Sequence, residues 1–190
     1  MGDYHIGLEM TRCYERYFDH QELKLHDQID RLCAVNIEIE ILSDLINKLS
    51  HAKRKNKEAD FNRDEMVRRY IVHIHNNNPT IFEDLIQGYP DYIPESENGF
   101  FAKNVDELLN ESLKNIDMSR ITISVLSEEQ IDIVVQGLDG QLKKYNADLN
   151  ENMLHINKIY DDRSEMTRHA GDVLKNDTNL KEHINRKMGG

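Results

Sequence analysis

The chain contains no tryptophan, three prolines and two cysteines among its 190 residues. The scarcity of proline permits long uninterrupted helices, because a proline inside a helix removes a hydrogen bond and kinks or ends the helix. Hydrophobic residues make up 38% of the chain and charged residues 31%, which is typical of charged helices with a narrow apolar face. No apolar run approaches the roughly 20 residues that span a bilayer, so we expect no membrane span.

The two cysteines, Cys13 and Cys33, are 20 residues apart. On one helix they would be separated by roughly 30 Å and could not form a disulfide. We therefore expect reduced thiols, as in a protein made in the cytosol, with both side chains in or near an apolar seam. The first residues lack the pattern of a Sec-type signal peptide, so we expect cytosolic residence or export by a route that needs none.

Positive charge is also scarce, with 24 Lys and Arg against 35 Asp and Glu and a net charge of −11. Proteins that bind phosphate backbones need clustered Lys and Arg. The one basic run, residues 53–57, is short and is typical of a solvated bend. We therefore expect no nucleic-acid partner.

Motifs of catalysis and metal binding are weak or incomplete. His73 and His75 have a spacing used by metal ligands on a strand, but no third ligand follows at a defined offset. Residues 148–152 match part of a calcium loop, yet Met153 stands where the loop needs glycine and Ile159 where it needs glutamate. There is no glycine-rich phosphate loop and no nucleophile elbow. We expect no catalytic residue, no metal site and no cofactor, and so a protein that is not an enzyme.

The C-terminal third carries a long apolar stripe of helical period. Its steps alternate between three and four residues if one site is skipped at each of Asn152, Arg163 and Asp177, which is the spacing of a coiled-coil seam. About 55 residues at 1.5 Å each make a helix roughly 80 Å long. Ser127 and Gln130 form a capping-box pattern that predicts where this helix begins. The members of the stripe are Ile131, Val135, Leu138, Leu142, Tyr145, Leu149, Ile156, Ile159, Met166, Ala170, Val173, Leu180 and Ile184.

A second seam in the N-terminal third predicts a partner helix. It changes phase once, between Ile29 and Val35. Its members are Leu25, Ile29, Leu32, Val35, Ile39, Leu42, Ile46 and Leu49.

Two seams separated by a compact insert predict a mainly α fold, a long antiparallel coiled-coil helical hairpin with a small α+β insert. We expect an N-terminal helical arm over residues 1–55, a mixed α/β insert over 56–126 and a C-terminal helix over 127–188. We expect the two helices to pack in a register in which the numbers of paired residues sum to about 188. This register pairs the intramolecular seam residues Ile46 with Leu142, Ile39 with Leu149, and Leu32 with Ile156. In this register five apolar residues lie beyond the N-terminal seam and are candidate contacts with another subunit or a chaperone: Met166, Ala170, Val173, Leu180 and Ile184.

Within the insert, residues 64–75 fit a helix, although their end also alternates like a strand, and periodicity alone leaves both open. Asn78 and Pro79 predict a short helix reaching Leu85. Residues 88–99 are expected to form a loop, and Asn104 to cap a helix ending near Ile116. Residues 120–125 alternate between β-branched and polar side chains and predict a strand.

Four stretches carry a resemblance to a known family. Residues 121–124 (Ile-Thr-Ile-Ser), then 126–131, then Tyr145, Asn146, Asp148 and Leu149 resemble the EspA/SseB family of type III secretion filament and sheath proteins. Residues 65–71 resemble the short helix that this family carries before its "ITIS"-like strand. The layout of two long helices around a small insert is similar to that of needle-tip proteins of the LcrV and IpaD type, and the resemblance covers roughly residues 60–175.

The resemblance implies an extracellular structural component of a needle tip or filament with no catalytic activity. Such a protein leaves the bacterium through the secretion needle and so resides in the cytoplasm only before export. It assembles as a homo-oligomer, supports translocator proteins and needs a secretion chaperone. The alternative that the residues alone leave open is a cytosolic coiled-coil adaptor or secretion chaperone.

Overall fold

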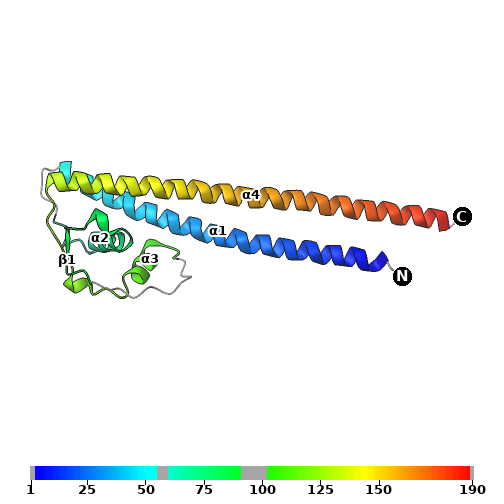
Figure 1. The fold of residues 1–190 in the computed structure, drawn as a ribbon, viewed down its shortest axis with the longest axis horizontal. Coiled ribbons are helices and arrows are strands. Elements are labelled where there is room, and N and C mark those ends of the chain that lie inside the picture. The colour runs from blue at the N-terminus through cyan, green and yellow to red at the C-terminus, as the bar shows by residue number, and fades with distance from the viewer. Residues whose placement is uncertain (1–2, 55–59, 91–101, 189–190) are drawn as a thin grey trace. The chain divides into compact units, whose positions relative to one another are not determined.

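The structure, a computed structural model, describes residues 3–54, 60–90 and 102–188. Two long helices, α1 (Asp3–Arg54) and α4 (Glu128–Met188), run in opposite directions, and the predicted mainly α fold with a long helix pair is confirmed (Figure 1). The chain divides into two compact units, unit 1 (Met1–Ile29 and Asn152–Gly190) and unit 2 (Asp30–Glu151). This division crosses both long helices, so it leaves the three segments predicted along the chain untested.

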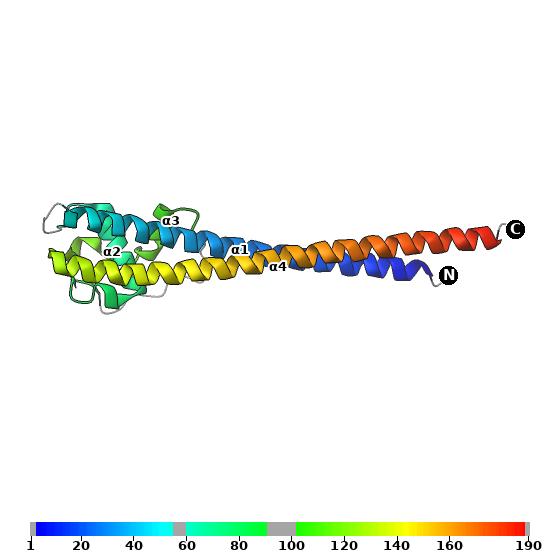
Figure 2. The same ribbon diagram turned by 90° about the horizontal axis from the view of Figure 1, so that it is seen from above.

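Unit 2 adds the short elements of the insert to the adjoining parts of α1 and α4. In both views α2 and α3 lie beside those parts of the long helices (Figure 2). The short elements are α2 (Glu65–Asn77), a 3-10 turn η1 (Pro79–Ile81), β1 (Ile86–Gln87), α3 (Val105–Ser112), a 3-10 turn η2 (Met118–Arg120) and β2 (Thr122–Ile123).

The start of α4 has the predicted capping box. The Ser127 N–H donates to Oε1 of Gln130 over 2.9 Å, and the Gln130 N–H donates to Oγ of Ser127 over 3.3 Å. Two backbone donors that the first turn cannot pair internally are thereby satisfied. Glu128 and Glu129 follow at once, where negative charge suits the N-terminal end of the helix.

Residues 65–77 form helix α2, which decides the question that periodicity left open. Oδ1 of Asp64 accepts from the Val67 N–H over 3.1 Å and caps the helix. His73 and His75 are both buried on this helix. Because the elements of unit 2 cover α2 on several sides, its C-terminal half is buried almost continuously, and this blurred the helical period in the sequence.

The other short elements are smaller than expected. Asn78 makes no side-chain cap, because its Oδ1 accepts from the Thr80 hydroxyl instead, and only the 3-10 turn η1 forms where a helix to Leu85 was predicted. Asn104 does cap α3, accepting from the Glu107 N–H over 2.9 Å, but α3 ends at Ser112 rather than near Ile116. Of the loop predicted over 88–99, residues 91–99 lie outside the described residues.

The predicted strand 120–125 is reduced to the two residues of β2. Asp117 accepts from the Ser119 N–H and so favours the preceding 3-10 turn η2. β2 pairs antiparallel with β1, Ile86 opposite Ile123 and Gln87 opposite Thr122. The side-chain amide of Asn62 also pairs with Ile123, donating to its carbonyl over 2.7 Å and accepting from its N–H over 2.9 Å.

The core of unit 2 lies where the short helices meet α1 and α4. Here α1 is buried on a broader face than a coiled-coil seam provides, so Ile37, Ile41 and Leu45 join the predicted Leu42 and Leu49. The further buried hydrophobic residues on helices in this core are Val67, Tyr70, Ile71, Val72 and Ile74 on α2, Leu109 on α3, and Ile131, Val134 and Leu138 on α4.

The register of α1 against α4 differs from the expected one in both units. In unit 2, Nζ of Lys53 pairs with Oδ1 of Asp132 over 2.6 Å, whereas a sum of 188 places Lys53 opposite Val135. In unit 1, the guanidinium of Arg163 lies 6.0 Å from the Phe18 ring centroid, whereas the expected register places Phe18 opposite Ala170. The shifts of three and seven residues keep the same general face of α4 toward α1, so the apolar pattern alone could not detect them.

Both cysteines are free, as expected, but Cys13 and Cys33 are exposed rather than part of a seam.

Candidate association surface

In unit 1 the seam of α1 contains two glutamines one heptad apart. Gln21 is buried, Gln28 is half-buried, and Leu25 lies between them. Ile29, which the sequence placed in the seam, is 39% exposed. With Gln28 in its place the seam needs no phase change, because the steps 21, 25, 28, 32, 35, 39, 42, 46, 49 alternate between four and three. Considering only apolar residues caused this error.

A hollow of about 330 Å³ lies on one side of the paired helices of unit 1. Oε1 of Gln28 is buried and has no hydrogen-bond partner among the described residues. A buried polar atom without a partner is costly, and a polar seam residue sets the register and number of helices at the expense of stability. The lining residues are Gln21, Lys24, Asp27, Gln28, His155, Lys158, Ile159 and Asp162.

Beside its α1-facing seam, about 100° around the helix, α4 carries a second stripe that is exposed and free of charge. We call it the second stripe; its members are Met153, Asn157, Tyr160, Ser164, Thr167, Gly171, Leu174 and Thr178. The steps again alternate between four and three, which is the spacing of a second helix contact. Tyr160 is 53% exposed and Leu174 64% exposed. The position that directly flanks a two-stranded seam usually carries Glu or Lys, so four uncharged residues there, Met153, Tyr160, Thr167 and Leu174, are unusual.

The two threonines make the second stripe more apolar than its composition suggests. The Thr167 hydroxyl donates to the Arg163 carbonyl over 2.8 Å, and the Thr178 hydroxyl donates to the Leu174 carbonyl over 2.9 Å. With the hydroxyls bonded to their own helix, the methyl groups form the outer surface. At Gly171 no atom outside the same stretch of helix lies within 4 Å of where a Cβ would be, so the helix backbone is open to close approach.

The predicted site residues lie as follows. Of the intramolecular seam residues, Ile156 is buried and five are half-buried: Leu32, Ile39, Ile46, Leu142 and Leu149. Their predicted pairing, with positions that sum to about 188, disagrees with the register given by the Lys53–Asp132 and Phe18–Arg163 contacts. Of the candidate subunit contacts, Met166, Ala170 and Val173 are half-buried, Leu180 is exposed, and the side chain of Ile184 lies outside the described residues. Their part in association stays a prediction. The second stripe escaped the sequence analysis because five of its eight members are small or polar.

Unit 2 contains a buried polar cluster around His73. Nδ1 of His73 is 2.7 Å from the Ser112 hydroxyl, and Nε2 is 3.0 Å from each Glu38 carboxylate oxygen and 3.2 Å from Nδ2 of Asn77. The order Ser–His–Glu matches that of a hydrolytic triad. His73 is only 2% exposed, however, and Ser112 ends α3, where carbonyls rather than oxyanion-binding N–H groups collect. The cluster therefore serves to join α1, α2 and α3.

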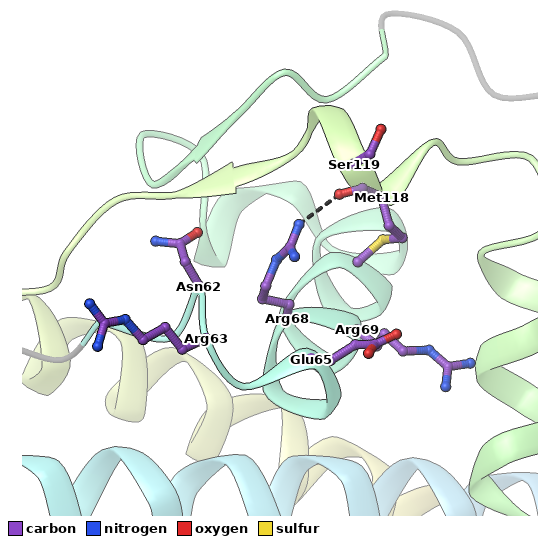
Figure 3. A pocket seen from close by; sticks show the side chains of 7 residues that line it. All are labelled: Asn62, Arg63, Glu65, Arg68, Arg69, Met118 and Ser119. Atoms are coloured by element: carbon purple, nitrogen blue, oxygen red, sulfur yellow. Dashed lines mark hydrogen bonds between the residues drawn. The ribbon is translucent and has the colours of Figure 1, made fainter.

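A second hollow, of about 340 Å³, lies in unit 2 beside Arg68. Nη2 of Arg68 donates to the carbonyls of Met118 over 2.6 Å and Ile121 over 2.9 Å. Figure 3 shows the side chains of Arg63 and Arg69 pointing away to opposite sides, and Arg69 donates to Oδ1 of Asn110 (Figure 3). Because the three guanidinium groups do not converge, the hollow is unsuited to an anion, and Arg68 acts as a clamp on η2.

His75 is the second buried histidine of α2. Its ring packs edge-on against Tyr89 with centroids 4.5 Å apart. Burial lowers the pKa of His75, and a hydrogen bond with the Pro79 backbone and the nearby Glu83 carboxylate oppose that shift only in part.

Within the described residues, no three His, Cys, Asp or Glu side chains gather closely enough to hold a metal ion. No helix among these residues has the length and apolar character needed to cross a membrane. Comparison of the chain with protein-family models, curated proteins and solved structures gives no match.

Proposed function

We propose that the protein is an extracellular structural component of a type III secretion needle tip or filament, which acts by self-assembly and supports translocator proteins. The observation that carries the proposal is the second stripe of α4, an exposed, uncharged surface in a chain of which 31% is charged. Met153, Tyr160 and Leu174 are exposed large hydrophobic side chains on this stripe, and exposed apolar surface of this kind marks an interaction site.

The narrow interior of unit 1 supports an assembly role. Among its described residues the buried hydrophobic side chains are Leu25, Ile156 and Ile159, each at the limit of burial with 9% exposure. Two helices held by so small a core gain stability when further helices pack on them. The resemblance of residues 60–175 to filament and needle-tip proteins supplies the biological setting.

The proposal also implies two partners and a route. Export through the needle requires no cleavable leader, and a dedicated chaperone would cover the second stripe in the cytoplasm before export. The test is to express the tagged full chain in a bacterium with a type III system and in a matched strain whose secretion ATPase is inactive. Appearance in the medium of the first strain alone, in assemblies larger than a monomer, supports the proposal. Equal retention in both strains overturns it.

The alternative, a cytosolic coiled-coil adaptor or secretion chaperone, is favoured by one observation. Cys13 and Cys33 are both free and exposed, which suits a reducing compartment. This function predicts retention in the cytoplasm and capture of a binding partner there, so the same export experiment separates the two.

A further inference from the structure

We propose that the partner of the second stripe is a second copy of the chain, with the two α4 helices side by side and parallel in register. The inference rests on the self-assembly part of the proposed function and names its contact surface. The interface is isologous, so each copy contributes the same residues.

Large and small side chains are arranged on the second stripe in a way that suits self-pairing. Met153, Tyr160 and Leu174 share one heptad position, and Thr167 is the fourth member of that line. The neighbouring heptad position holds Asn157, Ser164, Gly171 and Thr178. These are the d and a positions of a coiled coil, in which the large d residues fill the interface and the small a residues let the backbones approach.

Asn157 favours the parallel arrangement. An asparagine at an a position pairs with its own counterpart in a parallel pair and fixes the register at some cost in stability. Gly171 adds room for close approach, because no atom outside its own stretch of helix lies within 4 Å of the position of its absent Cβ. An antiparallel pair would instead place Asn157 beside the heptad position that holds the large residues of the other copy. The Asn157 amide would then lose its partner asparagine.

The borders of the second stripe are consistent with this arrangement, with one exception. The contact of Phe18 with Arg163 sets the register of unit 1. In this register Glu15 of α1 lies at about the same height along the helix pair as Thr167 of α4. In a parallel pair, the side of the second stripe next to Glu15 in one copy faces the side next to Arg168 in the other copy. Opposite charges therefore meet there. By the same geometry Glu22 faces Asp161 of the second copy, the one unfavourable pair.

The first test compares two matched substitutions in the purified full chain. Leu174→Glu changes a residue of the second stripe that is 64% exposed, and Leu23→Glu changes a residue on the outer face of α1 that is 70% exposed. Sedimentation over a concentration series should show dimerisation weakened at least tenfold by Leu174→Glu and unchanged by Leu23→Glu. Asp161→Lys should strengthen it by removing the unfavourable pair. Equal behaviour of both Leu variants, each shown to be folded by circular dichroism, overturns the proposal.

The second test determines orientation. In a chain carrying Cys13→Ser and Cys33→Ser, Ser164→Cys should form a disulfide-linked dimer on mild oxidation, because each residue 164 meets its counterpart in the parallel pair. Failure of this disulfide, together with crosslinking between Ser164→Cys and Thr167→Cys chains, overturns the parallel register.

These tests are independent of export. A chain that dimerises through the second stripe but never reaches the medium retains this inference and overturns the proposed function. A chain that is exported and forms assemblies that Leu174→Glu does not weaken retains the proposed function and overturns this inference.

Discussion

Gly88 lies against the carbonyl group of Arg120 so closely that a Cβ on Gly88 would be 2.1 Å from the Arg120 oxygen. Gly88 also has a φ of 77°, a backbone conformation that is unfavourable for residues other than glycine. We expect Gly88→Ala to lower the free energy of unfolding of unit 2 by more than about 2 kcal/mol, since strain and clash add. Urea denaturation followed by circular dichroism measures the change.

Gly140 is the matched control for that substitution. No atom outside the same stretch of helix lies within 4 Å of the place that an alanine methyl group would take at this position on α4, so Gly140→Ala should raise stability by up to about 1 kcal/mol through helix propensity. A loss of stability in both variants would contradict the distinction drawn between the two glycines.

The capping box of α4 gives a second prediction. Ser127→Ala removes the acceptor for the Gln130 N–H and should cost about 1 kcal/mol. Ser127→Asp, which restores an acceptor at the helix N-terminus, should recover most of that loss. Thermal unfolding of the three chains checks the order, and equal midpoints would show that the cap contributes nothing.

The pairing of Glu38 with His73 gives a third prediction. Glu38→Leu leaves Nε2 of buried His73 without its carboxylate partner and should destabilise unit 2 by about 1–3 kcal/mol. Glu38→Gln keeps an acceptor at the same place and should cost less. Hydrogen exchange of the α2 amides locates the effect; a uniform change across unit 1 as well would contradict it.

His75 gives a pH prediction whose sign follows from its burial. Because burial lowers the pKa of His75 in the folded chain, the unfolded chain binds the proton more readily. The contribution of His75 to stability is therefore complete above its ordinary pKa of 6.5 and decreases as the pH falls below that value. His75→Phe should flatten the pH dependence between about pH 7 and 5, measured by urea unfolding; an unchanged slope would assign that dependence to other groups.

Local signals in the sequence predicted the ends of helices well, because a cap depends on residues three apart. Ser127 with Gln130, and Asn104, are the clearest cases. Predictions that needed distant partners were less successful. The length of β2 depends on pairing with β1, and the burial of Ile41 depends on helices of the insert that the seam pattern does not reveal.

The candidate site was harder to predict than the fold. A search for apolar residues found the α1-facing seam but placed Ile29 where Gln28 lies, since a polar side chain in a seam carries no hydrophobic signal. The second stripe was missed for the same reason. Its character depends on hydroxyls such as that of Thr167 bonding to their own backbone, which only the structure shows.

The amide of Asn62 occupies both the N–H and the carbonyl of Ile123, the groups through which β2 would otherwise accept another strand. Exposed strand edges are templates on which chains pair with one another and aggregate. A single side chain thus closes the β2 edge of the sheet, so that growth by strand addition is blocked at that edge.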